Sequence, residues 1–323
     1  MFDTATAIAP ARLHLGFLDM NGGLGRRFGS LGLAIDGPAT RLSIARAPSP
    51  GIEGVEGPRG ASYLEILSGH LRLPHAYALT ISEAIPAHAG LGSGTQLALA
   101  VAAALRCLEG LPPDPAGDAA LLRRGERSGV GAAVFERGGF IVDGGHGEKT
   151  RTPPVIARLE FPPDWRIILV LDSRAKGVHG PQERAAFAQL GVFEGSAAAE
   201  ICRLVLIKAL PALAEKDIDA FGGAIGRIQD IVGDYFAPAQ GGGRYASAAV
   251  ADAMDALTRF GAKGAGQSSW GPTGFAFAES ENDARRLGAR LREKGVEPGI
   301  DIAICKGLNH GALVKGQSFD ANS

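Results

Sequence analysis

Cysteine is scarce in this 323-residue chain, which has only Cys107, Cys202 and Cys305. Each lies in an apolar segment and no two form a Cys-x-x-Cys pair, so we expect reduced thiols and neither a disulfide framework nor a cysteine-based metal site. The histidines also lack the spacing of zinc ligands, such as His-x-x-x-His. The sequence therefore indicates no particular residue as a metal ligand.

Long apolar runs and an excess of one charge are also missing. The longest apolar run, residues 97–105, is far short of the roughly 20 residues that cross a bilayer, and residues 1–10 lack the pattern of a secretory leader. The formal net charge is −1 with a pI near 6.7, so there is no broad positive field for nucleic acid. We expect a cytoplasmic protein with small-molecule substrates and no membrane partner.

Enough apolar sequence is present to form a sizeable core. The chain is 46% hydrophobic and 21% charged, which is typical of an ordered globular protein. A mass of 33.3 kDa favours two modest domains, with Pro153 and Pro154 as the candidate boundary. We predict domains at residues 1–155 and 156–323, and an α+β fold because strands and helices alternate without a strict βαβ rhythm.

The apolar periodicity predicts the following elements. Strands are expected at residues 8–18, 31–35, 40–45, 78–84, 139–143, 166–171, 273–278, 299–304 and 312–314. Helices are expected at residues 97–109, 118–127, 196–215 with a break at Pro211, 217–235, 246–260 and 281–294. Residues 48–60 are rich in proline and glycine and are predicted to form a hairpin or an exposed loop.

Glycine is abundant, with 47 residues, and its most informative cluster immediately precedes the helix at 97–109. The predicted phosphate or pyrophosphate site comprises Gly90, Leu91, Gly92, Ser93, Gly94, Thr95 and Gln96. Unpaired amides and the positive dipole end of a helix favour an anion there, and glycine allows its close approach. The alternative is a plain helix cap, because Ser93 and Gln96 have capping-box spacing.

Other polar residues give candidate substrate contacts. Arg12 and His14 share one face of the strand at 8–18 and could contact a phosphate or a carboxylate, or could simply be surface or packing residues. Trp270 could stack on an aromatic substrate or could be a core tryptophan. The remaining candidates are Gly266, Gln267, Ser268 and Ser269 beside Trp270, and Arg174, Lys176 and His179 in a segment that is either a cap over a polyanion or an exposed loop.

Three motifs resemble those of the GHMP superfamily of small-molecule kinases. Pro86-x-x-x-Gly90-Leu91-Gly92-Ser93 resembles its phosphate loop, P-x-x-x-G-L-G-S-S. Residues 9–12, Ala-Pro-Ala-Arg, resemble its opening A-P-G-R strand, and residues 264–266 resemble its third, glycine-rich motif. The resemblance implies a ribosomal-S5-like N-terminal half, a ferredoxin-like C-terminal half and a phosphate site between them.

One kinase feature is absent. The kinases of this superfamily carry S-G-x-D, whose aspartate assists the acceptor hydroxyl, whereas this chain has Gly131 at the aspartate position. Loss of such a base typically lowers a rate by about 10²–10⁴, which argues against a competent kinase. Residues 92–96, 128–143 and 266–273 resemble instead the β-ribofuranosylaminobenzene 5′-phosphate synthase family, a non-kinase branch of the superfamily.

That resemblance implies a pentosyltransferase of methanopterin biosynthesis, with Mg²⁺ accompanying the donor and no organic cofactor. The implied reaction joins phosphoribosyl pyrophosphate to 4-aminobenzoate and releases carbon dioxide and pyrophosphate. Because carbon dioxide, not a proton, leaves the ring, no base is needed at Gly131. No residue is assigned a catalytic role.

Two alternatives and one assembly remain open at this point. An ATP-dependent kinase would need a replacement acid, for which Asp143 and Glu136 are candidates. A phosphometabolite sensor would bind its ligand without turnover. The apolar helices also make a homodimer plausible.

Overall fold

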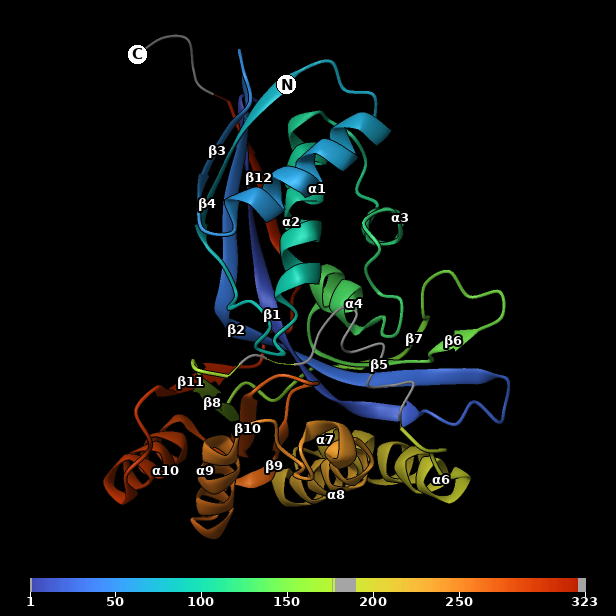
Figure 1. Cartoon of the computed structure of the whole chain (residues 1–323), viewed down its shortest axis with the longest axis vertical. Coiled ribbons are helices and arrows are strands. Elements are labelled where there is room, and N and C mark those ends of the chain that lie inside the picture. The colour runs from blue at the N-terminus through green and yellow to red at the C-terminus, as the bar shows by residue number, and fades with distance from the viewer. Residues whose placement is uncertain (1, 176, 178–189, 319–323) are drawn as a thin grey trace.

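The computed structural model describes residues 2–175, 177 and 190–318, so the candidates Lys176 and His179 lie outside the described residues. Two sheets meet at an angle, and helices pack against both of them (Figure 1). The second sheet is antiparallel, and the first is antiparallel except for one parallel pair of strands. The mixture of separate sheets and helices confirms the α+β fold. Within the described residues, no helix combines the length and the apolar character that a membrane crossing requires.

The first sheet is built on two long strands, β1 (Thr4–Asp19) and β2 (Arg26–Ala47), which pair antiparallel. The strands predicted at 31–35 and 40–45 are therefore two parts of one strand. The other strands of this sheet are β3 (Gly51–Gly54), β4 (Ala76–Glu83), β5 (Phe140–Asp143), β6 (His146–Gly147), β7 (Val155–Leu159) and β12 (Leu313–Gln317). Because β12 pairs with β1, and β7 with β5, this sheet includes strands from beyond residue 155.

Helices α1 (Gly57–His70) and α2 (Ser93–Leu108) pack together beside this sheet, and α3 (Pro115–Leu121) and α4 (Val130–Arg137) follow. The loop predicted at 48–60 is wrong, because the segment contains β3 and the start of α1. Pro58 occupies the first turn of α1, where no N–H is required. A side chain at Gly60 would stand 2.6 Å from Cδ1 of Ile81, so this glycine allows close packing on β4.

The second sheet has the order β11 (Ile300–Lys306), β8 (Arg166–Asp172), β10 (Thr273–Ala278) and β9 (Lys263–Gln267). One face packs against α9 (Ala248–Arg259) and α10 (Glu281–Lys294). The other face contributes to the largest apolar core, together with β1 and α8 (Ile218–Phe236). This shared core joins the two sheets.

The helix predicted at 196–215 continues past the expected break. It consists of α6 (Gly195–Leu204), a π-helical turn (Val205–Ala209) and α7 (Leu210–Glu215). Pro211 has no amide to donate and its ring would crowd a normal α-turn. The wider π-turn immediately before it accommodates the proline without ending the helix.

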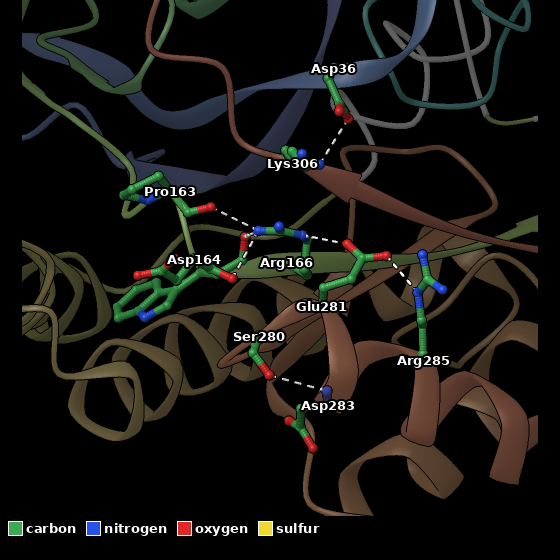
Figure 2. A network of polar contacts seen from close by, with 10 residues as sticks. Asp36, Pro163, Asp164, Arg166, Ser280, Glu281, Asp283, Arg285 and Lys306 are labelled. Carbon is green, nitrogen blue, oxygen red and sulfur yellow. Dashed lines mark hydrogen bonds and ion pairs between the residues drawn. The ribbon is translucent and has the colours of Figure 1, made fainter.

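Polar contacts also link the two sheets, as Figure 2 shows. The backbone N–H of Lys306 in β11 donates to Oδ1 of Asp36 in β2 at 2.8 Å. At the start of β8, Arg166 donates to the carbonyl oxygens of residues 163–165 and to Oε2 of Glu281 at 2.7 Å. The Lys306 bond therefore ties the edge strand of the second sheet to the first sheet, whereas the Arg166 contacts tie the start of α10 to β8 and to the segment that precedes it.

Candidate phosphate and substrate site

The glycine loop ends at the first turn of α2, which faces the junction of the two sheets (Figure 1). Gly92 is the N-cap residue with φ 83°, and its carbonyl accepts the amides of Thr95 and Gln96, each at 3.1 Å. The alternative capping box is wrong, because the side chain of Gln96 donates to the Gly131 carbonyl at 2.9 Å. The amides of Ser93 and Gly94 therefore begin the helix without an intrahelical acceptor.

Arg12 of β1 lies directly beside this loop. Its amide donates to the Leu91 carbonyl at 3.0 Å and its Nη1 donates to the Gly90 carbonyl at 2.8 Å. A Cβ atom at Gly92 would stand 2.9 Å from Cγ of Arg12. The first and second predicted motifs are therefore in contact, and a positive charge lies against the loop.

The third glycine-rich motif closes the other side of the loop. Oγ of Ser268 donates to the Gly90 carbonyl at 2.8 Å and accepts the amide of His14 at 3.0 Å. Gly271 packs so tightly against Ala89 and Gly90 that no Cβ atom would fit. Three motifs that are far apart in the sequence thus meet at one place.

A cavity adjoins these motifs, between β1, α8 and the segment after β9. The residues that line it are His14, Gly16, Phe17, Gln229, Val232, Gly233, Phe236, Gln240, Arg244, Gln267, Ser269 and Trp270. Four of the predicted substrate residues are among them. Its volume of about 20 Å³ is close to that needed by a single water molecule, so the lining side chains would have to move for an aromatic acid to enter. With that movement, this cavity is the candidate acceptor site.

His14 is buried and its imidazole is uncharged. Only 3% of the residue is exposed, and burial, followed by the positive charge of Arg12, lowers the pKa of His14 well below 6.5. Its ring centroid lies 4.6 Å from that of Phe17. His14 therefore gives the cavity a neutral polar edge.

Trp270 is a core residue that also lines the cavity, so the core interpretation is confirmed and its stacking on a substrate stays a prediction. It is 3% exposed, and its ring centroid lies 4.3 Å from that of Phe236. Its indole is thus held in place by the apolar core.

Gln267 and Gly266 support the backbone near the cavity. Oε1 of Gln267 accepts the amide of Ala246 at 2.6 Å, and its Nε2 donates to Oε1 of Gln240 at 2.8 Å. A Cβ atom at Gly266 would collide with the side chain of Gln229. These contacts give a structural role to Gln267, which lines the cavity, and to Gly266, which precedes it in β9.

The structure does not place the guanidinium of Arg174 with the glycine loop. It is held by Asp172 at 2.9 Å and by Glu297 at 2.9 Å, and the pair lowers the pKa of Asp172. Arg174 lies instead at a separate depression beside Ser247. Its charge is already neutralised by the two carboxylates.

Two arginines that the sequence did not suggest stand over the first turn of α2. Nη1 of Arg124 and the guanidinium of Arg59 both approach the point where a Cβ of Gly94 would be. Tyr63 lies between them and accepts hydrogen bonds from both, at 3.1 Å from Arg59 Nε and 2.7 Å from Arg124 Nη2. Arg59 and Tyr63 have i, i+4 helical spacing, but this signal was hidden because the segment was predicted as a loop.

Neither candidate for the missing kinase acid lies at the loop with a free carboxylate. The two oxygens of Asp143 accept the amides of Gly129 at 2.9 Å and Gly145 at 2.8 Å, and its burial raises the pKa of this carboxyl group. Glu136 pairs with Arg137 and lines a different cavity, between α2 and β12.

The side chain of Thr95 occupies the space that the kinase aspartate would need at position 131. A Cβ atom at Gly131 would stand 2.9 Å from Cγ2 of Thr95. An aspartate there would have to displace a residue of the glycine loop.

The groups around the loop do not fit a magnesium ion held by the protein. Mg²⁺ prefers carboxylate oxygens, whereas the side chains described here are mainly guanidinium and hydroxyl groups, and the nearby Glu56 is paired with Arg59 at 3.4 Å. Across the described ranges, no group of three or more acidic, histidine or cysteine side chains is arranged to bind a metal.

Comparison with known proteins agrees with this geometry. Residues 61–139 match the model for the GHMP kinases N terminal domain and residues 209–297 the model for GHMP kinases C terminal. The fold resembles homoserine kinase from Cytophaga hutchinsonii, with a TM-score of 0.69, 18% identity and coverage of 98% of both chains. It also resembles mevalonate pyrophosphate decarboxylase from Streptococcus pyogenes, with a TM-score of 0.70, 15% identity and coverage of 95% and 98%. These findings confirm the GHMP fold.

Closer relatives are named beta-ribofuranosylphenol 5′-phosphate synthase. The protein from Methanothermobacter thermautotrophicus is 32% identical over 94% of this chain and 97% of its own length. The protein from Archaeoglobus fulgidus is 32% identical over 95% and 98%, respectively. The chain belongs to this synthase family of the GHMP superfamily.

Proposed function

We propose that this protein transfers a ribosyl 5-phosphate group from phosphoribosyl pyrophosphate to a para-substituted benzoate, with loss of carbon dioxide. The observation that carries the proposal is the meeting of a helix start with unpaired amides, several arginines and a cavity edged by aromatic side chains at a site that lacks the kinase acid. The family relationship supports the class of product. The pathway we propose for it is methanopterin biosynthesis.

The reaction balances without a protein base. The ring carbon that bears the carboxylate attacks the anomeric carbon, and a new C–C bond forms as the bond between the anomeric carbon and the diphosphate oxygen breaks. The bond from the ring to the carboxylate then breaks, and its electron pair restores aromaticity as carbon dioxide leaves. Gly131 is compatible with this sequence, because no proton must be taken from the ring.

The residues of the site have distinct tasks in this scheme. The amides at the start of α2 and the nearby guanidinium groups stabilise the departing diphosphate. In this scheme the buried side chains of His14 and Trp270 would shield the electron-poor anomeric carbon from water on one side. An uncharged His14 adds no positive charge next to that centre.

The para substituent of the acceptor is the finer point of the proposal. The resemblance found in the sequence implied 4-aminobenzoate, whereas the name of the relatives describes a phenol product. Amino and hydroxyl groups both donate electron density to the ring carbon that reacts. We therefore propose both acids as candidate acceptors, with 4-hydroxybenzoate favoured by the relatives' name.

Magnesium enters the proposal only as a companion of the donor. Since the loop residues offer no fitting carboxylate set, Mg²⁺ would be carried by diphosphate oxygens and would reduce their negative charge. The protein's own contribution to charge neutralisation is then made by its arginines and amides.

The test is to incubate the purified protein with phosphoribosyl pyrophosphate, Mg²⁺ and each acid, and to identify the product by mass spectrometry. The proposal predicts a decarboxylated ribosyl-arene phosphate whose C–C bond resists acid hydrolysis. A parallel reaction with ATP and a panel of alcohols tests for kinase activity. ADP formation without the ribosyl product would refute the synthase proposal.

A further inference from the structure

We propose that Arg59 and Arg124, held in position by Tyr63, bind the diphosphate group of the donor over the first turn of α2. The identity of the donor rests on the proposed function, whereas the preference for a diphosphate can be measured without turnover. These side chains lie outside the motifs that the sequence singled out.

The geometry brings both guanidinium groups to one point. Arg124 Nη1 lies 3.3 Å from the position of a Gly94 Cβ, and Cζ of Arg59 lies 3.5 Å from it. The hydroxyl of Tyr63 receives hydrogen bonds from both arginines, and its ring lies 5.3 Å from Cζ of Arg124. The tyrosine thus orients two forked donors toward the same space above the helix start.

This arrangement is electrostatically incomplete. The two guanidinium groups lie close together and therefore repel each other. The positive end of the α2 dipole, which lies beside them, repels both. Glu56 offsets part of the charge of Arg59, at 3.4 Å and partly exposed. Nε of Arg124 is buried and has no hydrogen-bond partner among the described residues. A bound polyanion would offset both charges, and arginine forks match phosphate oxygens in geometry.

Gly94 explains how the arginines reach this place. The kinase loop pattern has serine at this position, whereas here any Cβ atom would collide with Nη2 of Arg59. The departure from the kinase pattern therefore makes room for a guanidinium group directly on the helix start. Arg12, in contrast, lies against Gly92, on the side of the loop that leads to His14.

The arginine pair over Gly94 and Arg12 beside Gly92 would contact different parts of the donor. We assign the diphosphate to Arg59 and Arg124 and the ribose end to the side of Arg12 and the cavity. A ligand with one phosphate on the ribose would consequently be insensitive to the loss of Arg59 or Arg124.

Isothermal titration calorimetry with inorganic pyrophosphate and, separately, ribose 5-phosphate tests this division on the full-length protein. Because charge-assisted hydrogen bonds are lost, R59M and R124M should each weaken pyrophosphate binding by about 10- to 100-fold. Ribose 5-phosphate affinity should change less than about twofold. The matched control is R123M, because the side chain of Arg123 is highly exposed and pairs with Glu126 at 3.2 Å. This variant should bind pyrophosphate as the wild type does.

A second variant tests the role of the glycine. Gly94→Ser should weaken pyrophosphate binding in the wild type by displacing Arg59, but should add little in the R59M background because the displaced group is already gone. Circular dichroism of each variant verifies folding, so that loss of affinity is not loss of structure.

The outcomes are distinct. Selective loss of pyrophosphate affinity with non-additive Gly94→Ser supports the assignment. Unchanged pyrophosphate affinity in both arginine variants, equal weakening of the two ligands, or weakening of ribose 5-phosphate alone would overturn it. If the wild type bound neither ligand, the proposed function itself would fail, which separates the two failures.

Discussion

His14 is the residue whose charge state matters most for the cavity. Burial and Arg12 keep its imidazole neutral in the folded protein, whereas the same group titrates near 6.5 in the unfolded chain. The unfolded state therefore takes up a proton as the pH falls through 6.5 while the folded state does not, and this difference lowers the free energy of unfolding.

We predict that the free energy of unfolding falls between about pH 7.5 and pH 5, and that H14Q reduces this fall because glutamine does not titrate. Urea unfolding at the two pH values measures the effect. An identical pH dependence in the wild type and H14Q would contradict the burial of a neutral imidazole.

Gly131 gives a second prediction for a single residue. G131D should lower the free energy of unfolding by about 1–3 kcal/mol, because the new side chain must displace Thr95 in a packed site. It should not create kinase activity, since the rest of the site does not position an acceptor hydroxyl. Thermal unfolding and ADP formation are the measurements, and robust ATP turnover would overturn this expectation.

The sequence predicted some site residues and missed others for identifiable reasons. Glycines and Arg12 could be found because they occur in contiguous motifs with a physical meaning at a helix start. Arg59 and Arg124 could not, because only the tertiary packing of α1 and of the segment after α3 brings them over Gly94. Gln267 was predicted to bind substrate, yet its side chain is occupied by backbone and amide partners.

Among the structural elements, the junction between two glycine loops positions the start of α2. The backbone of the segment after β9 is in direct contact with the backbone of residues 89–90. In addition, the amide of Gly177 donates to the His88 carbonyl at 3.1 Å. Gly271 is the residue at the centre of this contact. The helix start and the third motif therefore keep their relative position only while this packing is intact.

We predict that Gly271→Ala lowers the free energy of unfolding by about 1–3 kcal/mol, since the neighbouring backbone cannot move aside as a side chain would. It should also weaken pyrophosphate binding, because the two loops must separate. Gly69→Ala is the control, because open space surrounds Gly69 in α1 and alanine favours a helix. Equal stability and equal pyrophosphate affinity in Gly271→Ala and the wild type would contradict this role.

Element prediction was most accurate where apolar periodicity was uninterrupted. The helix at 281–294 matches α10, whose N-cap Ser280 accepts the amide of Asp283 at 3.2 Å. Proline and glycine caused the errors, because Pro58 begins a helix and Pro211 follows a π-turn. Composition alone does not distinguish these uses from a loop or a helix end.

At the scale of the whole molecule, the site depends on both sheets and on chain segments far apart in the sequence. Arg12 comes from β1, the anion loop precedes α2, and Trp270 follows β9 of the second sheet. The overall fold could be predicted because the three motifs resemble those of one superfamily. The sequence could not predict which residues lie on the anion side of the site and which on the acceptor side, because this arrangement arises only when the two sheets pack together.

The most direct test of the reaction is the stoichiometry of its two leaving groups. Carboxyl-labelled 4-hydroxybenzoate or 4-aminobenzoate and phosphoribosyl pyrophosphate are mixed with the protein, and labelled carbon dioxide and pyrophosphate are measured in the same samples. The two should appear in equal amounts, and neither should form without the other substrate. Pyrophosphate release without labelled gas would contradict the attack of the carboxylate-bearing ring carbon on the donor.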